Sequence, residues 1–373
     1  MLATVTNRQR VWRMARMGIC ALLLTVCRAT ASAQPVEAFP SDLPVVWQAP
    51  QPLEVATAPS MPELDVGVVL FDPGVERNDD SPAAVVRRLE ASLLARELKA
   101  ALIESNQFGV VRLVPEASAL TPVSIHSEIL RSDGRDLIIH VTVRDAMSQV
   151  WFDHTISYRE TFSSGADTSP KEIFHAVSNR LRSNWWQYSA EQRTNLIEAS
   201  EVRYAQTLAP DAFADMVNVS DDGWELNRLP ATDDPMWARV TRVRNQEYLF
   251  CDAIDEQYED LAERVMPTYA LWRRATVEQA AWLERYEQRV MERDEKGHDS
   301  RFARMQAQYA AYRSYRMQEQ ALYELAEAFE NETEPTTLRT LEQVVRLEGT
   351  LASQYNEWRR LLRDIFILEQ GAL

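Results

Sequence analysis

The sequence predicts an α+β protein, in which a small mixed sheet with helices on one face precedes a long-helix antiparallel bundle or coiled-coil region. Between residues 63 and 198, short apolar runs and helical patterns follow one another in the order β-α-β-β-β-β-α. From residue 236 onward the composition changes to long helical stretches rich in Glu, Arg, Gln and aromatic residues. Helices joined by short breaks fold back on one another, which predicts the bundle.

The first half opens with a buried strand and an amphipathic helix. Residues 64–73 form an apolar run with β-branched side chains, which is typical of a buried strand. Ser81 then supplies a helix N-cap, Pro82 follows it, and apolar residues recur at helical spacing as far as Glu104. Residues 108–114 form a second short strand.

Three extended segments come next. Residues 123–131, 136–144 and 149–162 are separated by short turns, and the middle segment alternates two sets of side chains between its faces. This pattern predicts an antiparallel meander. A second helix begins near Pro170.

Three helices are expected in the second half of the chain. The first runs from Pro235 to Lys296 and contains Pro267, which kinks or divides it. The second covers residues 301–330. The third spans residues 336–369, where apolar side chains at every third or fourth position form a seam for a neighbouring helix.

These elements divide the chain into five parts: a signal peptide (residues 1–33), a Pro-rich spacer (34–62), the mixed α/β domain (63–198), a linker (199–235) and the helical bundle (236–370). The spacer is semi-rigid because each proline fixes its own φ. It would either hold the folded part away from a membrane or lie on the domain as an arm, with Trp47 and the two preceding valines docking.

The leader has the parts of an export signal. Arginines precede the apolar run Met17–Cys27, which is too short to span a bilayer as a helix. Ala31 and Ala33 form the small-x-small site that a signal peptidase cuts, so we expect a periplasmic protein of a Gram-negative bacterium. Cys27 offers an alternative to cleavage after Ala33, because it follows a lipobox-like Leu-Thr-Val. In that case Cys27 would be acylated, and the protein would be a lipoprotein attached to the outer membrane.

Composition restricts the partners. The chain has 40 basic and 56 acidic residues, and the leader holds five arginines and no acid, so the mature chain carries a net charge of −21. Such a charge repels phosphates and anionic lipids, so we expect no nucleic-acid partner, and a membrane only through lipidation of Cys27. Cys251 is the single mature cysteine, which favours a small buried side chain; an intermolecular bridge or a reactive thiol is the alternative.

Three phrases in the first half resemble the α/β domain at the N-terminus of TolB and in CsgG-like bacterial envelope lipoproteins. They are VVLF from residue 68, NQFGVV from residue 106 and VRDAMSQVW from residue 143. The resemblance covers roughly residues 63–190 and implies the topology of that domain. It also implies a binding module in envelope assembly, secretion or a peptidoglycan-linked machine, and it transfers no catalytic residue.

We expect no catalytic, cofactor-binding or metal-binding residue, because the chain lacks a nucleophile elbow and a phosphate-binding Gly-rich loop. His126, His140 and His154 fall on successive predicted strands, and three histidines suit zinc only if the strand register brings them to one face. Glu172 and His175 have the spacing of a carboxylate-bridged metal site, without the second such pair that these sites need.

A binding or scaffold role in a periplasmic or outer-membrane-associated assembly is therefore the leading hypothesis. The partner would be an envelope protein, with peptidoglycan or another glycan as a further candidate, and the helical region would form a homo-oligomer. The candidate interaction surface consists of aromatic residues in the helical region: Trp272, Trp282, Tyr286, Tyr312 and Tyr315. The alternative is a periplasmic enzyme or a glycan-binding module with a site between the two domains.

Overall fold

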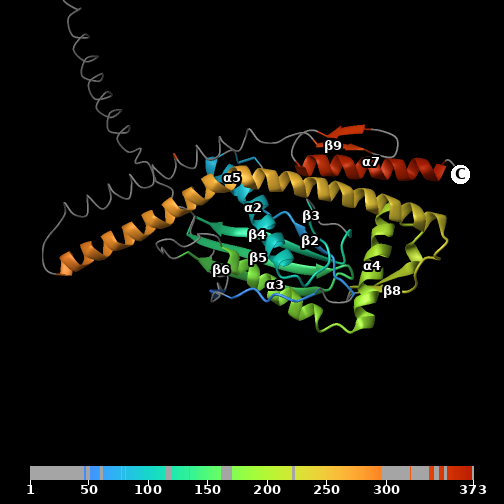
Figure 1. Ribbon diagram of the computed structural model, residues 1–373, viewed down its shortest axis with the longest axis horizontal. Coiled ribbons are helices and arrows are strands. Elements are labelled where there is room, and N and C mark those ends of the chain that lie inside the picture. Colours follow the sequence, from blue (N-terminus) through green and yellow to red (C-terminus); the bar gives the residue numbers. More distant parts are fainter. Residues whose placement is uncertain are drawn as a thin grey trace, which may run out of the picture. The chain divides into compact units, whose positions relative to one another are not determined.

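The fold is built on a mixed β-sheet, as the sequence predicts (Figure 1). The computed structural model describes residues 46–47, 51–58, 62–76, 78–79, 81–114, 119–133, 135–160, 170–220, 223–295, 320, 336–339, 344–347 and 351–371. The leader with Cys27, Ala31 and Ala33, and the expected helix at 301–330 with Tyr312 and Tyr315, lie outside these residues.

The sheet has the strand order β1-β6-β5-β4-β2-β3. Its strands are β1 (Val46–Trp47), β2 (Val66–Val69), β3 (Val111–Val114), β4 (Val123–Ser132), β5 (Asp136–Asp145) and β6 (Val150–Arg159). The three long strands form the predicted antiparallel meander, while β2 runs parallel to both β3 and β4. The α+β class with a mixed sheet is thereby confirmed.

Helices cover one face of this sheet. On β5, Ile139, Val141 and Val143 are fully buried, whereas the intervening His140 and Thr142 are half-exposed. Helices α2 (Pro82–Glu104) and α3 (Lys171–Trp185) pack side by side over the buried face (Figure 1). The alternation that predicts a half-buried strand thus also identifies the covered face.

Helix α2 begins where the sequence predicts, with Ser81 as its N-cap. The Oγ atom of Ser81 accepts a hydrogen bond from the backbone N–H of Ala84 at 3.3 Å, and Pro82 occupies the first helical position. A proline at this position costs the helix no hydrogen bond, because the first N–H groups of a helix have no acceptor within it.

The segment expected as a linker, residues 199–235, contains regular structure. It holds the end of α4 (Ala190–Leu208), a 3-10 turn (Ala214–Met216) and the antiparallel pair β7 (Val217–Ser220) and β8 (Gly223–Leu226). Helix α4 begins with a capping box in which Ser189 and Gln192 bond to each other's backbone N–H groups.

The longest helix, α5 (Pro235–Glu295), has nearly the predicted bounds, and Pro267 lies inside it without ending it. Helix α5 lies along the edge strand β3, where the carboxylate of Asp255 accepts a hydrogen bond from the backbone N–H of Leu113 at 3.0 Å. This contact satisfies an N–H that an edge strand would otherwise leave open for another chain.

The prediction of one continuous helix over 336–369 is wrong in its first third. Strands β9 (Thr336–Arg339) and β10 (Val344–Leu347) form an antiparallel pair there, and helix α7 (Leu351–Gly371) begins after them. Both strands contain adjacent β-branched residues, which lose side-chain freedom in a helix and favour extended backbone.

A single buried apolar cluster extends from the sheet to the C-terminal helix. At its far end, the ring of Phe250 on α5 stacks on Trp358 of α7 with centroids 5.6 Å apart. Cys251 is fully buried beside this contact, as expected for a small apolar side chain, and burial raises the pKa of its thiol. Across the part of the chain that the structure describes, no helix has the length and apolar content needed to cross a bilayer.

The pH dependence of stability tests the contact between α5 and β3. Burial raises the pKa of Asp255 from 3.8 to about 6, although Lys99 Nζ lies 3.0 Å away and lowers it. Because this carboxyl binds its proton more tightly in the folded protein, it stabilises the fold below about pH 4, and this contribution is lost as the pH rises through 6. The loss amounts to about 2–3 kcal/mol.

We expect Asp255→Asn to abolish this loss between pH 4 and pH 7, measured by urea unfolding of both proteins. Asp252→Asn is the matched control, because its half-exposed carboxylate on the same helix pairs with Arg112 near the surface. Parallel stability curves for wild type and Asp255→Asn would show that Asp255 is not buried against β3.

Candidate functional site

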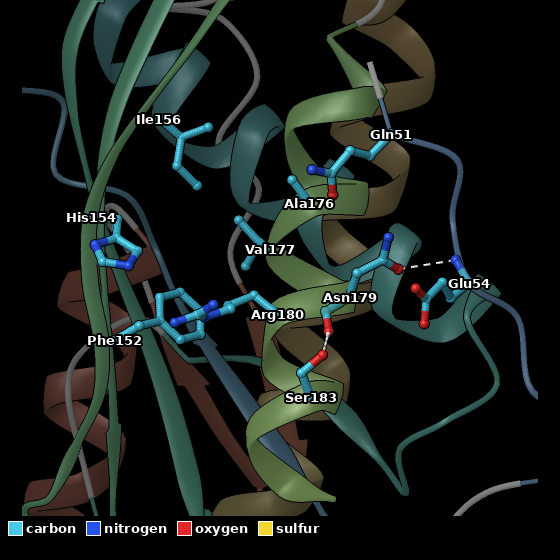
Figure 2. Close-up of a pocket in the computed structure, with 10 residues that line it drawn as sticks. All are labelled: Gln51, Glu54, Phe152, His154, Ile156, Ala176, Val177, Asn179, Arg180 and Ser183. Atoms are coloured by element: carbon cyan, nitrogen blue, oxygen red, sulfur yellow. Dashed lines mark hydrogen bonds between the residues drawn. The ribbon is translucent and has the colours of Figure 1, made fainter. Parts of the chain in front are cut away.

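A cavity of about 370 Å³ lies between β6 and α3 on the helix-covered side of the sheet (Figure 2). Strand β6 supplies one wall, α3 the other, and the segment from residue 51 to residue 58 closes it from outside. The lining residues are Gln51, Glu54, Phe152, His154, Ile156, Ala176, Val177, Asn179, Arg180 and Ser183.

Strand periodicity places the β6 residues. Phe152, His154 and Ile156 occupy alternate positions, and each lies opposite a fully buried residue of β5. They therefore face α3 rather than the open side of the sheet, and Figure 2 shows them across from the helix. The rings of Phe152 and His154 lie 6.1 Å apart and nearly parallel, with an interplanar angle of 29°.

The cavity combines an apolar floor with a polar rim. Phe152, Ile156 and Val177 are buried, whereas His154 and Arg180 are exposed at the opening. The guanidinium of Arg180 forms no hydrogen bond or ion pair within the described part of the chain. A positive charge at the edge of an apolar hollow favours a ligand with an apolar group and an anionic one.

The outer wall belongs to the Pro-rich spacer, whose described part lies on the domain as an arm. The side chain of Asn179 accepts a hydrogen bond from the N–H of Glu54 at 2.9 Å and donates one to the carbonyl of Pro52 at 3.0 Å. The carboxylate of Glu54 pairs with Arg182 on α3. Since Arg182 neutralises Glu54, the charge of Arg180 at the cavity is not cancelled by the arm.

The arm also reaches the edge of the sheet. Strand β1 pairs in parallel with β6, and between the described residues this pairing involves Ile156 and Ser157 of β6. Among the described residues, no strand pairs with the outer edge of β6 from Val150 to Thr155, which lies next to the cavity.

The three histidines considered for zinc do not share a face. His126 and His140 lie on the open side of the sheet, and His154 lies on the helix-covered side. Burial, followed by the charge of Arg144, lowers the pKa of His126, and its Nε2 lies 3.0 Å from the hydroxyl of Ser124.

His140 has partners of its own: its Nε2 is 2.8 Å from the carboxylate of Asp153, and its Nδ1 is 3.3 Å from the hydroxyl of Thr155. The Nδ1 atom of His175 lies 3.2 Å from the carbonyl of Gln51. Across the described residues, no three His, Cys, Asp or Glu side chains gather as metal ligands would.

The phrase at residues 143–151 forms the turn between β5 and β6. The carboxylate of Asp145 accepts hydrogen bonds from the N–H groups of Met147 and Gln149, both at 2.9 Å, and from the indole of Trp151 at 3.0 Å. Burial raises the pKa of Asp145 despite these donors. Trp151 stacks on Trp185 of α3 at 6.2 Å, so the phrase joins the meander to the helix layer.

Of the aromatic residues chosen from the sequence, the three that the structure describes, Trp272, Trp282 and Tyr286, lie on α5 and do not line the cavity. Trp272 is half-buried and packs against Tyr269 at 5.7 Å beside α2. Trp282 is 42% exposed and stacks on Tyr286 with centroids 5.4 Å apart.

Sequence reasoning missed Asn179, Arg180 and Ser183, because polar residues at helical spacing resemble a solvated face. The Pro-rich segment gives a partial signal for these residues. If it lies on the domain as an arm, its backbone N–H and C=O groups need polar partners on the surface beneath it. No protein family, no characterised protein and no solved structure matches this chain.

Removal of the Asn179 side chain should release the arm. Asn179→Ala deletes two hydrogen bonds to the backbone of the arm, which contribute roughly 0.5–1.5 kcal/mol each. We expect faster amide hydrogen exchange over residues 51–58, measured by mass spectrometry. Asn184→Ala is the control, because the side chain of Asn184 donates to the carbonyl of Arg180 within α3 and not to the arm. Equal exchange in wild type and Asn179→Ala would contradict the docked arm.

Proposed function

We propose that this protein is an exported, non-catalytic binding module of the bacterial envelope, and that it holds a segment of a partner protein in the cavity between β6 and α3. The observation that carries the proposal is a hollow with an apolar floor and a cationic rim, beside a length of β6 that pairs with no further strand among the described residues. Ligand sites are commonly hollows of this size that combine apolar side chains with polar groups placed to orient the ligand. The export signal expected at residues 1–33 supports the location.

An extended peptide fits this site best. The outer edge of β6 presents backbone N–H and C=O groups, and a strand added there would direct alternate side chains toward α3. An apolar side chain would lie on Phe152 and Val177, and a carboxylate on the same face would pair with Arg180. The proposed partner is therefore an envelope protein that offers an extended segment with alternating apolar and acidic residues.

Site-specific photo-crosslinking in living cells tests this proposal. A photoreactive amino acid at Ser183, which is exposed on the cavity rim, should form an adduct with a partner, whereas one at Asn195, which is exposed on α4, should not. Arg180→Glu should lower the adduct yield roughly tenfold, because attraction for an acidic side chain becomes repulsion.

Arg264→Glu, at an exposed position of α5, controls for the change in net charge. Mass spectrometry of the adduct should identify a segment with acidic residues. Crosslinks confined to the chain itself, or equal losses for Arg180→Glu and Arg264→Glu, would contradict the proposal.

A second candidate, a glycan-binding role, rests on the stacked pair Trp282 and Tyr286. Exposed aromatic rings offer an apolar face with a polar edge, as sugar rings require. In that case peptidoglycan fragments should change the intrinsic tryptophan fluorescence, and Trp282→Ala should abolish the change. Trp186→Ala is the control, since Trp186 is an exposed tryptophan that follows α3. An unchanged titration for Trp282→Ala would exclude this pair as the site.

A further inference from the structure

A second cavity, of about 280 Å³, lies where α4, α5 and α7 meet. It is separate from the cavity at β6 and shares no lining residue with it. Its described lining residues are Tyr204, Thr207, Leu208, Glu247, Arg359, Arg360, Leu362 and Arg363. Three of these eight are arginines from a single stretch of α7, in a chain whose net charge is −16.

The one acidic residue of this lining already has its partners. Glu247 is 2% exposed, and its carboxylate accepts hydrogen bonds from the hydroxyls of Tyr204 at 2.7 Å and Tyr355 at 2.6 Å. The Nε atom of Arg359 lies 3.3 Å from the same carboxylate. Burial, followed by the charge of Glu247, raises the pKa values of both tyrosines, so they stay protonated as donors.

Of the two remaining arginines, one has a weak ion pair at the surface and the other has none among the described residues. The Nη2 atom of Arg360 lies 3.7 Å from the carboxylate of Glu357, on the exposed surface of the same helix. Arg363 has no hydrogen bond or ion pair within the described part of the chain. Both are exposed at the mouth of the cavity, while the Glu247–Arg359 pair forms its neutral interior.

We infer that this cavity binds an oxyanion, a phosphate or carboxylate group of a small ligand, with Arg360 and Arg363 as the binding groups and Arg359 held in position by Glu247. Guanidinium groups present planar pairs of N–H donors that match two oxygens of such an anion. With a volume of about 280 Å³, the cavity has room for a diphosphate or a tricarboxylate.

Isothermal titration of the purified full chain with inorganic diphosphate and with citrate tests the inference. We expect binding of at least one of the two, and the stronger one identifies the phosphate or the carboxylate as the preferred group. The double variant Arg360→Gln/Arg363→Gln should weaken this binding at least about tenfold. Arg285→Gln/Arg289→Gln removes the same charge from exposed positions of α5 and should change the affinity less than about twofold.

A second variant tests whether binding depends on the cavity itself and not only on the charge of the arginines. Thr207→Trp fills the space from α4 without altering the charge of any residue, and it should also abolish binding. Thr207 is exposed, so this variant and the double arginine variant should retain the circular dichroism spectrum of the wild type. Failure of both anions to bind at millimolar concentration, equal losses in the two double variants, or unchanged binding in Thr207→Trp would each overturn the inference.

Discussion

Charged and polar side chains buried along α5 require partners, and those partners come from nearly every other part of the fold. Glu247 meets tyrosines of α4 and α7, Asp255 meets the edge of β3, and Tyr269 donates a 2.6 Å hydrogen bond to the buried carboxylate of Glu90 on α2. A buried charge that loses its partner costs about 3–5 kcal/mol, which exceeds the contribution of most single apolar contacts. Helix α5 therefore has one register against the sheet and the other helices.

The same constraint recurs at Arg273, which is 1% exposed one turn beyond Tyr269. Its Nη1 donates to the Tyr269 hydroxyl at 3.2 Å, and its Nη2 lies 3.9 Å from the buried carboxylate of Glu160 at the end of β6. This chain of contacts joins α2, α5 and β6. Helix α3 packs against both α2 and β6, so this frame also supports the helical wall of the cavity, which is present without a ligand.

Much of the fold follows from local patterns in the sequence, because burial of one face imposes a period. The meander and the course of α2 were predictable for this reason, and local end signals such as the Ser81 cap of α2 and Pro235 at the start of α5 helped to give the bounds of the helices. The hairpin β9–β10 was missed because a helical spacing of apolar residues outweighed the β-branched pairs Thr336–Thr337 and Val344–Val345. Neither cavity was predictable, because the first depends on a contact between Asn179 and Glu54, 125 positions apart, and the second on three helices. Arg180 becomes a candidate binding residue only because the packing of α3 against β6 places it at the cavity.

Native-state hydrogen exchange tests most directly whether the charges buried along α5 make it one cooperative unit with the sheet. We expect amides of α5 between residues 240 and 277 to exchange with the same opening free energy, and the same denaturant dependence, as those of β5. An α5 that opens at a clearly lower free energy while β5 stays protected would show that its buried partners do not hold it to the sheet.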